Sequence, residues 1–484
     1  MSEPTPVDDP LRPSEERAAE AEAQFAEDRT LTPGFVRAVS EAVEKTDAET
    51  VGKLCEDVHP ADIADLLGLV REEELAGLVT LLGGRLAPDV LAELDPDLRE
   101  DVIGAMEAGQ VAEAVAELET DDAAFILEDL DEAKQAEILA EVPVTERLAL
   151  RAALDYEEDT AGRLMQREVF AAPAYWTVGQ IIDRLRSHDD LPDRFYEVFV
   201  VDPTFKPVGA VPLSTLLKAP RETVIKDIMT DKDVKRIPVS MDQEEVAYLF
   251  EQYNLISAPV VDAAERLVGM ITVDDVVEIV HEETHEDMLA LAGVEADTGL
   301  SDTVLETVRS RFSWLAVNLA TAILASLVIA LFDGAIDQIV ALAILMPIVA
   351  SMGGNAGTQT LTIAVRSLAT KDLTPSNAAR IIWREVLVGG ANGVVFAVLL
   401  GALAGIWYYW TAGGDGAVSI ELALVVGAAM IVNLLAAGLA GILIPLGLQR
   451  AGADPAVSSA VFVTTVTDVV GFFVFLGLAA IVLL

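Results

Sequence analysis

The spacing of apolar residues divides the chain into segments with different predicted folds. Between residues 58 and 154, large apolar side chains recur every 12 positions, and turn or helix-start signals such as His59-Pro60 and Asp95-Pro96 follow several of them. A unit of this length accommodates one short helix and one turn, and stacked units share a continuous core. The spacing therefore predicts an all-α superhelical N domain over residues 31–155. The recurring positions are Val58, Val70, Leu82, Leu94, Met106, Leu118, Leu130, Val142 and Leu154.

The pattern changes to short β-rich runs in the next segment. Val198–Val201 and Ala258–Val261 each end before an aspartate, and a glycine follows that aspartate by seven residues within a second apolar run. The two copies are 60 residues apart, and amphipathic helical segments flank each pair of strands. Two β-α-β-β-α copies of this size resemble a tandem pair of cystathionine-β-synthase-type (CBS) domains. We place this α/β pair and the junction before it at residues 156–283.

Five long apolar stretches follow an acidic helical segment. The acidic segment predicts a connecting helix, which we place at residues 284–311 and expect to be helical from Val280 to about Val308. Each apolar stretch is long enough to cross a hydrocarbon core of about 30 Å at about 1.5 Å per residue. They predict a five-helix transmembrane domain over residues 312–484, embedded in a lipid bilayer. The stretches cover residues 312–332, 337–359, 385–410, 420–447 and 456–484.

Basic residues predict the orientation of this membrane half. Arg309 and Arg311 precede the first stretch, four more lie between the second and third stretches, and Arg450 lies between the fourth and fifth. The other two loops and the C-terminal end contain no lysine or arginine. Cytoplasmic loops carry an excess of these residues. We therefore expect a multi-pass plasma-membrane protein with its soluble half in the cytoplasm and Leu484 outside.

Negative charge is concentrated in the soluble half. The first 308 residues carry 71 acidic and 25 basic side chains, whereas the remaining 176 residues carry 8 and 7. A field of this sign repels phosphate, which argues against nucleic acid as a partner. Abundant carboxylates with only 9 lysines are typical of a cytoplasm rich in salt. We expect residues 1–30 to be a disordered acidic arm without a signal peptide, and the single cysteine, Cys55, excludes an internal disulfide.

The last apolar stretch contains one charged side chain, Asp468, near its middle. A carboxylate at this depth is costly unless it faces a partner, a cavity or a cation. Three threonines precede it and no basic residue lies nearby in the sequence, which favours an ion pathway with Asp468 as its charged ligand. The alternative is a protonated, hydrogen-bonded aspartate between packed helices.

The second stretch ends in a segment rich in glycine, Met346 to Thr360. Proline and glycine within a span are expected to break or tighten the helix and to free backbone carbonyls, which membrane proteins tolerate where they line a cavity. Asn355 and Gln359 are one helical turn apart and can face one cavity. Close helix packing through small residues is the alternative. Asn433 in the fourth stretch is a second amide, for which we expect an interhelical hydrogen bond.

The composition of the membrane half favours a hard cation. It contains no histidine and no cysteine, so carboxylate, amide, hydroxyl and carbonyl oxygens are the available ligands, which suit Mg²⁺, Ca²⁺ or Mn²⁺. Mg²⁺ gives up water reluctantly and needs few direct ligands. One aspartate per chain is sparse for a divalent ion. A two-fold homodimer with both Asp468 carboxylates on its axis would supply two charges.

Three sequence segments together resemble the MgtE-type magnesium channels and transporters. They are Tyr156–Met165 at the domain junction, Gly353–Gln359 with Arg366–Ala369 in the second stretch, and Asp454–Val469 in the last. The order of N domain, CBS pair, connecting helix and five spans also matches. The resemblance implies a dimeric, Mg²⁺-selective pore with Asp468 as its carboxylate and the Thr464 carbonyl nearby. The sequence departs from the family pattern at Ala356, Thr358 and Ala460.

The same resemblance implies that cytosolic Mg²⁺ binds acidic interfaces of the soluble half and holds the pore closed. Chance alignment of carboxylates in so acidic a chain is the alternative. CBS pairs often bind ATP or another adenine nucleotide, and the Thr272 and Asp275 spacing of the second copy fits such a site. His281 and His285 are one turn apart, and we interpret them as solvated. The implied sensor residues are Asp275, Glu278, Glu283, Glu286 and Asp287, with Asp121 and Asp122 opposite them.

Two other functions compete with Mg²⁺ permeation. One is a CBS-regulated transporter of Co²⁺, Mn²⁺ or Ca²⁺, and the other is a membrane-anchored CBS sensor that signals to a partner. Asp468 and the glycine-rich second stretch argue against a mere anchor, which needs neither. We do not expect an enzyme, because the sequence offers no nucleophile–base pair and no phosphate-binding loop in the right context.

Overall fold

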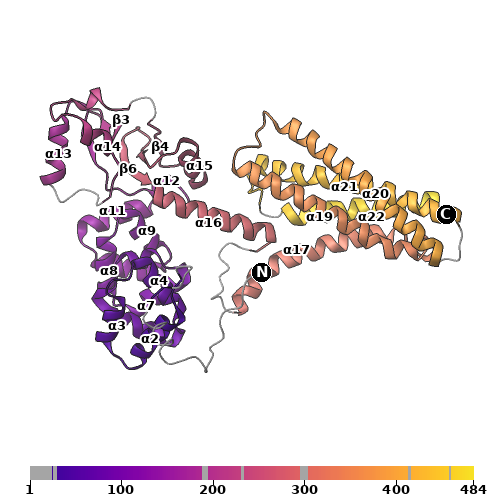
Figure 1. Ribbon diagram of the computed structural model, residues 1–484, viewed down its shortest axis with the longest axis horizontal. Helices are drawn as coiled ribbons and strands as arrows, with labels where there is room; N and C mark the ends of the chain where they lie inside the picture. The colour runs from indigo at the N-terminus through magenta and orange to yellow at the C-terminus, as the bar shows by residue number, and fades with distance from the viewer. Residues whose placement is uncertain are drawn as a thin grey trace. The chain divides into compact units, whose positions relative to one another are not determined.

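The computed structural model describes residues 24–25, 30–187, 194–230, 234–294, 304–411, 416–456 and 459–484. They fall into two compact units, Met1–Ile279 and Val280–Leu484. The predicted fold class is confirmed, because a helical N domain, two small α/β domains and five membrane-length helices follow one another along the chain (Figure 1). The arm predicted for residues 1–30 lies almost entirely outside the described residues.

The N domain is a stack of short helices. Proline at the first helical position begins several of them, as Pro60 and Pro96 do after their cap residues His59 and Asp95. Their bounds are α2 (Pro33–Glu44), α3 (Ala48–Cys55), α4 (Pro60–Leu69), α5 (Glu72–Leu82), α6 (Asp89–Ala92), α7 (Pro96–Ala105), α8 (Ala108–Glu117), α9 (Thr120–Glu128), α10 (Glu132–Glu141) and α11 (Val144–Leu154).

The 12-residue repeat marks the ends of these helices. Val70, Leu118 and Val142 are the residues at which α4, α8 and α10 stop, and Leu82 is the last residue of α5. All nine recurring positions lie within the hydrophobic core of the N domain or against it. Each of these four helices therefore ends on an apolar residue that anchors the following turn to the shared core, and Leu118 in this way positions the acidic first turn of α9.

Two three-stranded sheets with the same topology follow the short helix α12 (Ala161–Leu164). In each sheet the central strand pairs in parallel with the first strand and antiparallel with the third. The first copy comprises β1 (Ala171–Pro173), α13 (Val178–Ser187), β2 (Glu197–Val201), β3 (Pro207–Pro212) and α14 (Leu213–Lys218). The second comprises β4 (Ile237–Pro238), α15 (Gln243–Tyr253), β5 (Ser257–Val261), β6 (Leu267–Thr272) and α16 (Val273–Ala292).

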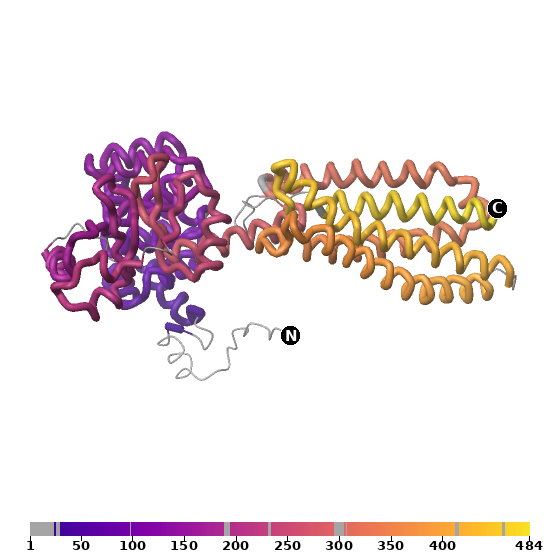
Figure 2. The backbone as a smooth tube through the Cα atoms, turned by 90° about the horizontal axis from the view of Figure 1, so that it is seen from above, coloured from indigo at the N-terminus to yellow at the C-terminus, as the bar shows by residue number. Residues whose placement is uncertain are grey.

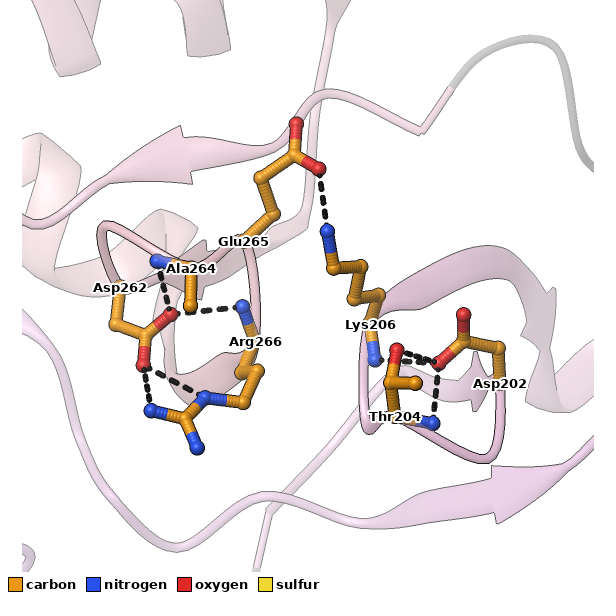
Figure 3. A network of polar contacts seen from close by, with 7 residues as sticks. All are labelled: Asp202, Thr204, Lys206, Asp262, Ala264, Glu265 and Arg266. Atoms are coloured by element: carbon orange, nitrogen blue, oxygen red, sulfur yellow. Dashed lines mark hydrogen bonds and ion pairs between the residues drawn. The ribbon is translucent and has the colours of Figure 1, made fainter.

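The aspartates that end the two central strands build equivalent turns (Figure 3). Asp202 accepts hydrogen bonds from the backbone N–H groups of Thr204 and Lys206, at 2.8 and 3.0 Å. Asp262 accepts them from Ala264 and Arg266, at 2.8 and 2.9 Å. An ion pair of 2.8 Å between Lys206 and Glu265 joins the two turns. The repeated aspartates are thus turn residues and not ligand-binding candidates. The candidate site of this region is therefore the start of α16.

The second unit holds five helices of membrane-spanning length, whose spans run side by side in Figure 2. Helix α21 packs against α19, α20 and α22, and α17 packs mainly against α22. The helices are α17 (Val304–Ala330), α19 (Ala341–Ala369), α20 (Ala378–Thr411), α21 (Gly416–Ala451) and α22 (Ser459–Val482), with the short helix α18 (Asp333–Gln338) between the first two.

Two sequence-based expectations about helices in this region are wrong. Helix α19 is one uninterrupted helix through Pro347 and the glycine pair, because glycines pack closely against α21 and α22 and neighbouring helices support a membrane helix across a proline. The connecting helix does not run from Val280 to Val308. Helix α16 ends at Ala292, where Gly293 takes a φ of +74° that glycine adopts without strain.

Candidate functional site

Asp468 lies near the middle of α22 with its side chain half-buried. Within the described ranges, its carboxylate makes no hydrogen bond and no ion pair. The turn before it faces α19, since a Cβ atom on Gly354 would lie 3.8 Å from Thr464 Cγ2 and 3.9 Å from Thr467 Oγ1. The alternative of a hydrogen-bonded aspartate between packed helices therefore finds no partner group in this part of the protein.

Thr464 uses its hydroxyl within its own helix. Thr464 Oγ1 donates to the carbonyls of Ala460 and Val461 at 3.0 Å, and its own carbonyl accepts from Thr467 Oγ1 at 2.9 Å. A cation that approached the Thr464 carbonyl would compete with the Thr467 hydroxyl. Thr464 also lines a cavity of about 170 Å³, together with Ala290, Leu291, Ala292, Gly293, Trp314, Asn318, Ala460 and Val461.

Helix α19 has a buried face and a polar face at the level of its glycine pair. Gly353 and Gly357 are buried against the neighbouring helices, whereas Ser351, Asn355 and Gln359 are exposed in the single chain. The three polar residues are spaced four apart and share one face of the helix. We call them the polar stripe of α19. Amides and hydroxyls in a membrane span are unfavourable against acyl chains, so this face requires a polar environment.

In the soluble half, four of the implied sensor residues lie in one acidic cluster. Asp121 and Asp122 are in the first turn of α9, and Asp275 and Glu278 are in the first turns of α16. Burial and, after it, neighbouring carboxylates together raise the pKa of Asp122 to about 6 and that of Glu278 to about 7. The buried Asp121 has its pKa raised well above the usual range by desolvation and by Asp275.

The remaining implied sensor residues lie farther along α16. Glu283 is half-buried and Glu286 is exposed. Asp287 is half-buried, and its pKa is raised to about 6 by desolvation and then by the nearby charges of Asp454 and Glu286. The structure therefore separates the seven residues into a group shared by α9 and the start of α16, and a later group that includes one carboxylate beside Asp454.

No cation ligand set is already assembled among the residues that the structure describes. Across the described residues, no group of three or more histidine, cysteine, aspartate or glutamate side chains is arranged to hold a metal ion. His281 and His285 are both exposed on α16. The acidic clusters thus have the oxygen ligands that Mg²⁺ prefers, at separations that a bound cation would have to shorten.

The pair Thr272 and Asp275 is satisfied internally. Asp275 Oδ2 accepts from the backbone N–H of Thr272 at 3.1 Å and from its hydroxyl at 2.9 Å, and the Thr272 hydroxyl also contacts Asp274. These bonds fix the start of α16, as a side-chain cap does. The same two residues were expected to bind the ribose of a nucleotide, which would have to replace these bonds.

Comparison with known proteins covers all three parts of the chain. Models described as the MgtE intracellular N domain, the CBS domain and a divalent cation transporter match residues 58–159, residues 161–222 with 225–282, and residues 346–478. The magnesium transporter MgtE of Thermus thermophilus is 31% identical over 450 residues, which are 92% of this chain and 98% of that protein. The chain belongs to the MgtE family of magnesium transporters.

Other MgtE proteins are also similar to this chain. The magnesium transporter MgtE of Enterococcus faecalis is 32% identical over 331 residues, covering 68% of this chain and 71% of that protein. Among solved structures, the cytosolic domain of the Mg²⁺ channel MgtE in complex with ATP is 31% identical, with a TM-score of 0.48, and covers 50% of this chain and 99% of that one. Membership of the MgtE family makes this chain a multi-pass membrane transporter.

Sequence reasoning missed several acidic residues of this MgtE chain that join the first cluster, among them Glu119 and Glu168. Desolvation and, after it, the charges of nearby carboxylates together raise the pKa of Glu119 to about 7; these carboxylates are Asp122, Asp275, Glu168 and Asp274. Glu119 accepts from Gln166 Nε2 at 2.6 Å, and Glu168 accepts from the Thr120 hydroxyl at 2.6 Å. These bonds cross from the N domain to the segment that begins the CBS pair. Glu119 directly precedes α9, which is the one signal that could have found it.

Magnesium should stabilise this MgtE chain more at neutral than at acidic pH. The cluster carboxyls have pKa values of about 6 to 7 in the fold and about 4 when unfolded. Their stabilising contribution is therefore complete below about pH 4 and is lost as pH rises through about 7. The protection factors of amides in α9 and the start of α16, which correct for the intrinsic pH dependence of exchange, should be lower at pH 7.5 than at pH 5.5 without Mg²⁺, and millimolar Mg²⁺ should restore protection at pH 7.5. Equal protection at both pH values would contradict the assigned cause.

Proposed function

We propose that this chain forms a Mg²⁺-selective channel or transporter of the plasma membrane, which cytosolic Mg²⁺ closes. Asp468 carries the proposal. It is a carboxylate within a membrane span that has no hydrogen bond or ion pair among the described residues. Such a group is costly in hydrocarbon unless a cation or water approaches it. The turn of α22 that precedes Asp468 lies against α19.

The working form is proposed to be a homodimer. The polar stripe of α19 is exposed in the single chain, and a second copy would cover it or complete an aqueous path along it. Two copies would also bring two Asp468 carboxylates to one path, which balances the charge of a divalent ion. A molecular mass in detergent of twice 51.5 kDa is the expected observation, and a monomeric mass in a transport-competent preparation would contradict it.

The proposed orientation places the soluble half in the cytoplasm and the C-terminus outside. Four basic residues lie at the C-terminal end of α19, at the start of α20 or in the loop between them: Arg366, Lys371, Arg380 and Arg384. Arg450 lies at the C-terminal end of α21. The loops that follow α17 and α20 lack lysine and arginine. This distribution supports the orientation through the positive-inside rule.

Gating is proposed to use repulsion within the two acidic groups. Carboxylates of α9 and α16 raise one another's pKa values, which means that their charges repel at neutral pH. A divalent cation relieves this repulsion and draws the elements together. A ligand that binds one conformation better than another shifts the population toward it. Rising cytosolic Mg²⁺ would thereby favour the compact, closed form.

An adenine nucleotide is the second proposed regulator, with Thr272 and Asp275 as its contacts. The internal bonds of this pair oppose the binding of the ribose, and the surrounding carboxylates oppose the binding of the phosphates. We therefore expect the nucleotide to act with Mg²⁺, which neutralises the phosphates, and to shift the Mg²⁺ concentration needed for closure rather than to open the pore by itself.

Reconstitution in liposomes tests these proposals together. Mg²⁺ influx should follow a dye signal, should be slower as internal Mg²⁺ increases, and should respond to internal ATP through the concentration that gives half-inhibition. Co²⁺, Mn²⁺ and Ca²⁺ serve as competing cations in the same assay. Absence of Mg²⁺ flux at low internal Mg²⁺ would overturn the transport function. Flux that is equal for all four cations would leave transport in place and overturn selectivity.

A further inference from the structure

Asn433 is a buried amide at the point where three membrane helices meet. It lies on α21, is completely inaccessible to solvent, and donates from Nδ2 to the carbonyl of Val349 in α19 at 2.8 Å. Its Oδ1 atom is buried and has no hydrogen-bond partner among the described residues. A buried polar atom without a partner is unfavourable for folding, so the fold alone does not explain an asparagine at this position.

Glycines from two helices enclose this amide. A Cβ atom on Gly353 of α19 would lie 2.2 Å from Asn433 Nδ2, and a Cβ atom on Gly471 of α22 would lie 2.9 Å from the same nitrogen. Real Cβ contacts are not this short, so either side chain would displace the amide or its helix. Asn433 therefore touches α19 and α22 at once, with a directional bond to the first and close contact with the second.

The two glycines stand close in sequence to the groups of the ion path. Gly353 is two residues before Asn355 of the polar stripe, and Gly471 is three residues after Asp468. A shift of either helix along its axis moves these groups by about 1.5 Å per residue. We propose that Asn433 is a positioning residue of the ion path, which fixes the axial register of α19 against α22. This inference rests on the proposed transport function.

Replacing Asn433 with leucine separates positioning from stability. Leucine has the same number and branching of side-chain heavy atoms, with bulkier methyl groups at the ends, and it removes both the bond to Val349 and the unpartnered oxygen. The melting temperature should stay within about 3 °C of the original, because one favourable and one unfavourable contribution are lost together. Mg²⁺ influx should fall at least about tenfold, since a misplaced group in a binding path is costly. Met430→Leu, at a fully buried apolar site one turn earlier on α21, should leave both quantities unchanged.

Glycine substitutions on α22 give a matched pair. Gly471→Ala places a methyl group against Asn433 and should reproduce the loss of influx. Gly477→Ala lies on the same helix, where the nearest atom to its Cβ would be 3.7 Å away on Phe332, and should not. Normal influx in Asn433→Leu or Gly471→Ala would overturn the proposal. The proposal would also be overturned if Gly477→Ala lost as much influx and as much melting temperature as Gly471→Ala.

A distance measurement tests the register without relying on transport. Spin labels at Ile363→Cys of α19 and Ile481→Cys of α22, both exposed positions, are each 10 residues from the contact glycine on their helix, so the labels should be about 30 Å apart along the bundle. In a Cys55→Ala background diluted with unlabelled chain, Asn433→Leu should shift or broaden this distance, and Met430→Leu should not. An unchanged distance would overturn the register role even if influx fell, whereas a shift in a chain that never conducts Mg²⁺ would support it and refute only the transport function.

Discussion

Replacing Asp468 with asparagine is expected to reduce Mg²⁺ influx into liposomes by about 100-fold or more. The substitution keeps the shape of the side chain and removes its charge. A carboxylate about 4 Å from a unit charge contributes about 4 kcal/mol at the effective dielectric constant of a partly hydrated site, and about 2.7 kcal/mol already corresponds to 100-fold. Because the carboxylate has no partner in the described part of the chain, its removal leaves no protein group unsatisfied.

The control for this prediction is Glu421→Gln. Glu421 lies in the second turn of α21, and its substitution removes the same charge from the same membrane unit. Influx should be normal in this variant, and both variants should purify with the melting temperature of the original chain. Influx through Asp468→Asn within twofold of the original would show that the carboxylate is not on the ion path. A large drop in melting temperature would instead identify a structural aspartate with a partner.

The sequence predicted those features whose signal is local. A charge in an apolar run, such as Asp468, is visible without a structure. The 12-residue repeat was visible because Val70, Leu118 and Val142 mark the ends of three helices of the N domain. The two CBS copies were visible because their turns repeat an aspartate at Asp202 and Asp262, each of which accepts backbone hydrogen bonds.

Features that depend on packing between distant segments could not be predicted in the same way. Asn433 was expected to form an interhelical hydrogen bond, which the structure confirms, but nothing local indicated that Gly353 and Gly471 enclose it. The continuity of α19 depends on neighbouring helices and not on its own proline and glycines. Glu119 was missed because the soluble half is rich in carboxylates, so the sequence does not distinguish one of them from the others. Gly293, which ends α16, was a local signal that the acidic helical pattern obscured.

Neutralising the cluster between α9 and α16 is expected to release the pore from inhibition by internal Mg²⁺. The variant combines Asp121→Asn, Asp122→Asn, Asp275→Asn and Glu278→Gln. These four carboxylates lie close enough to raise one another's pKa values, so a cation between them gains from several charges and loses all of them in the variant. The internal Mg²⁺ concentration for half-inhibition should rise at least about tenfold, while influx at very low internal Mg²⁺ should stay the same.

A charge-matched control is needed because the whole soluble half is acidic. Asp65→Asn, Glu113→Gln, Glu137→Gln and Glu141→Gln remove the same four charges from exposed positions of the N domain. If inhibition reflects a general attraction of cations to an acidic surface, both variants should shift the half-inhibition concentration equally, and the sensor proposal fails. If the cluster binds Mg²⁺, only the first variant shifts it, and hydrogen exchange of α9 in that variant should no longer respond to Mg²⁺ at neutral pH. This second result follows from the electrostatics, because without the repelling charges there is nothing for the cation to relieve.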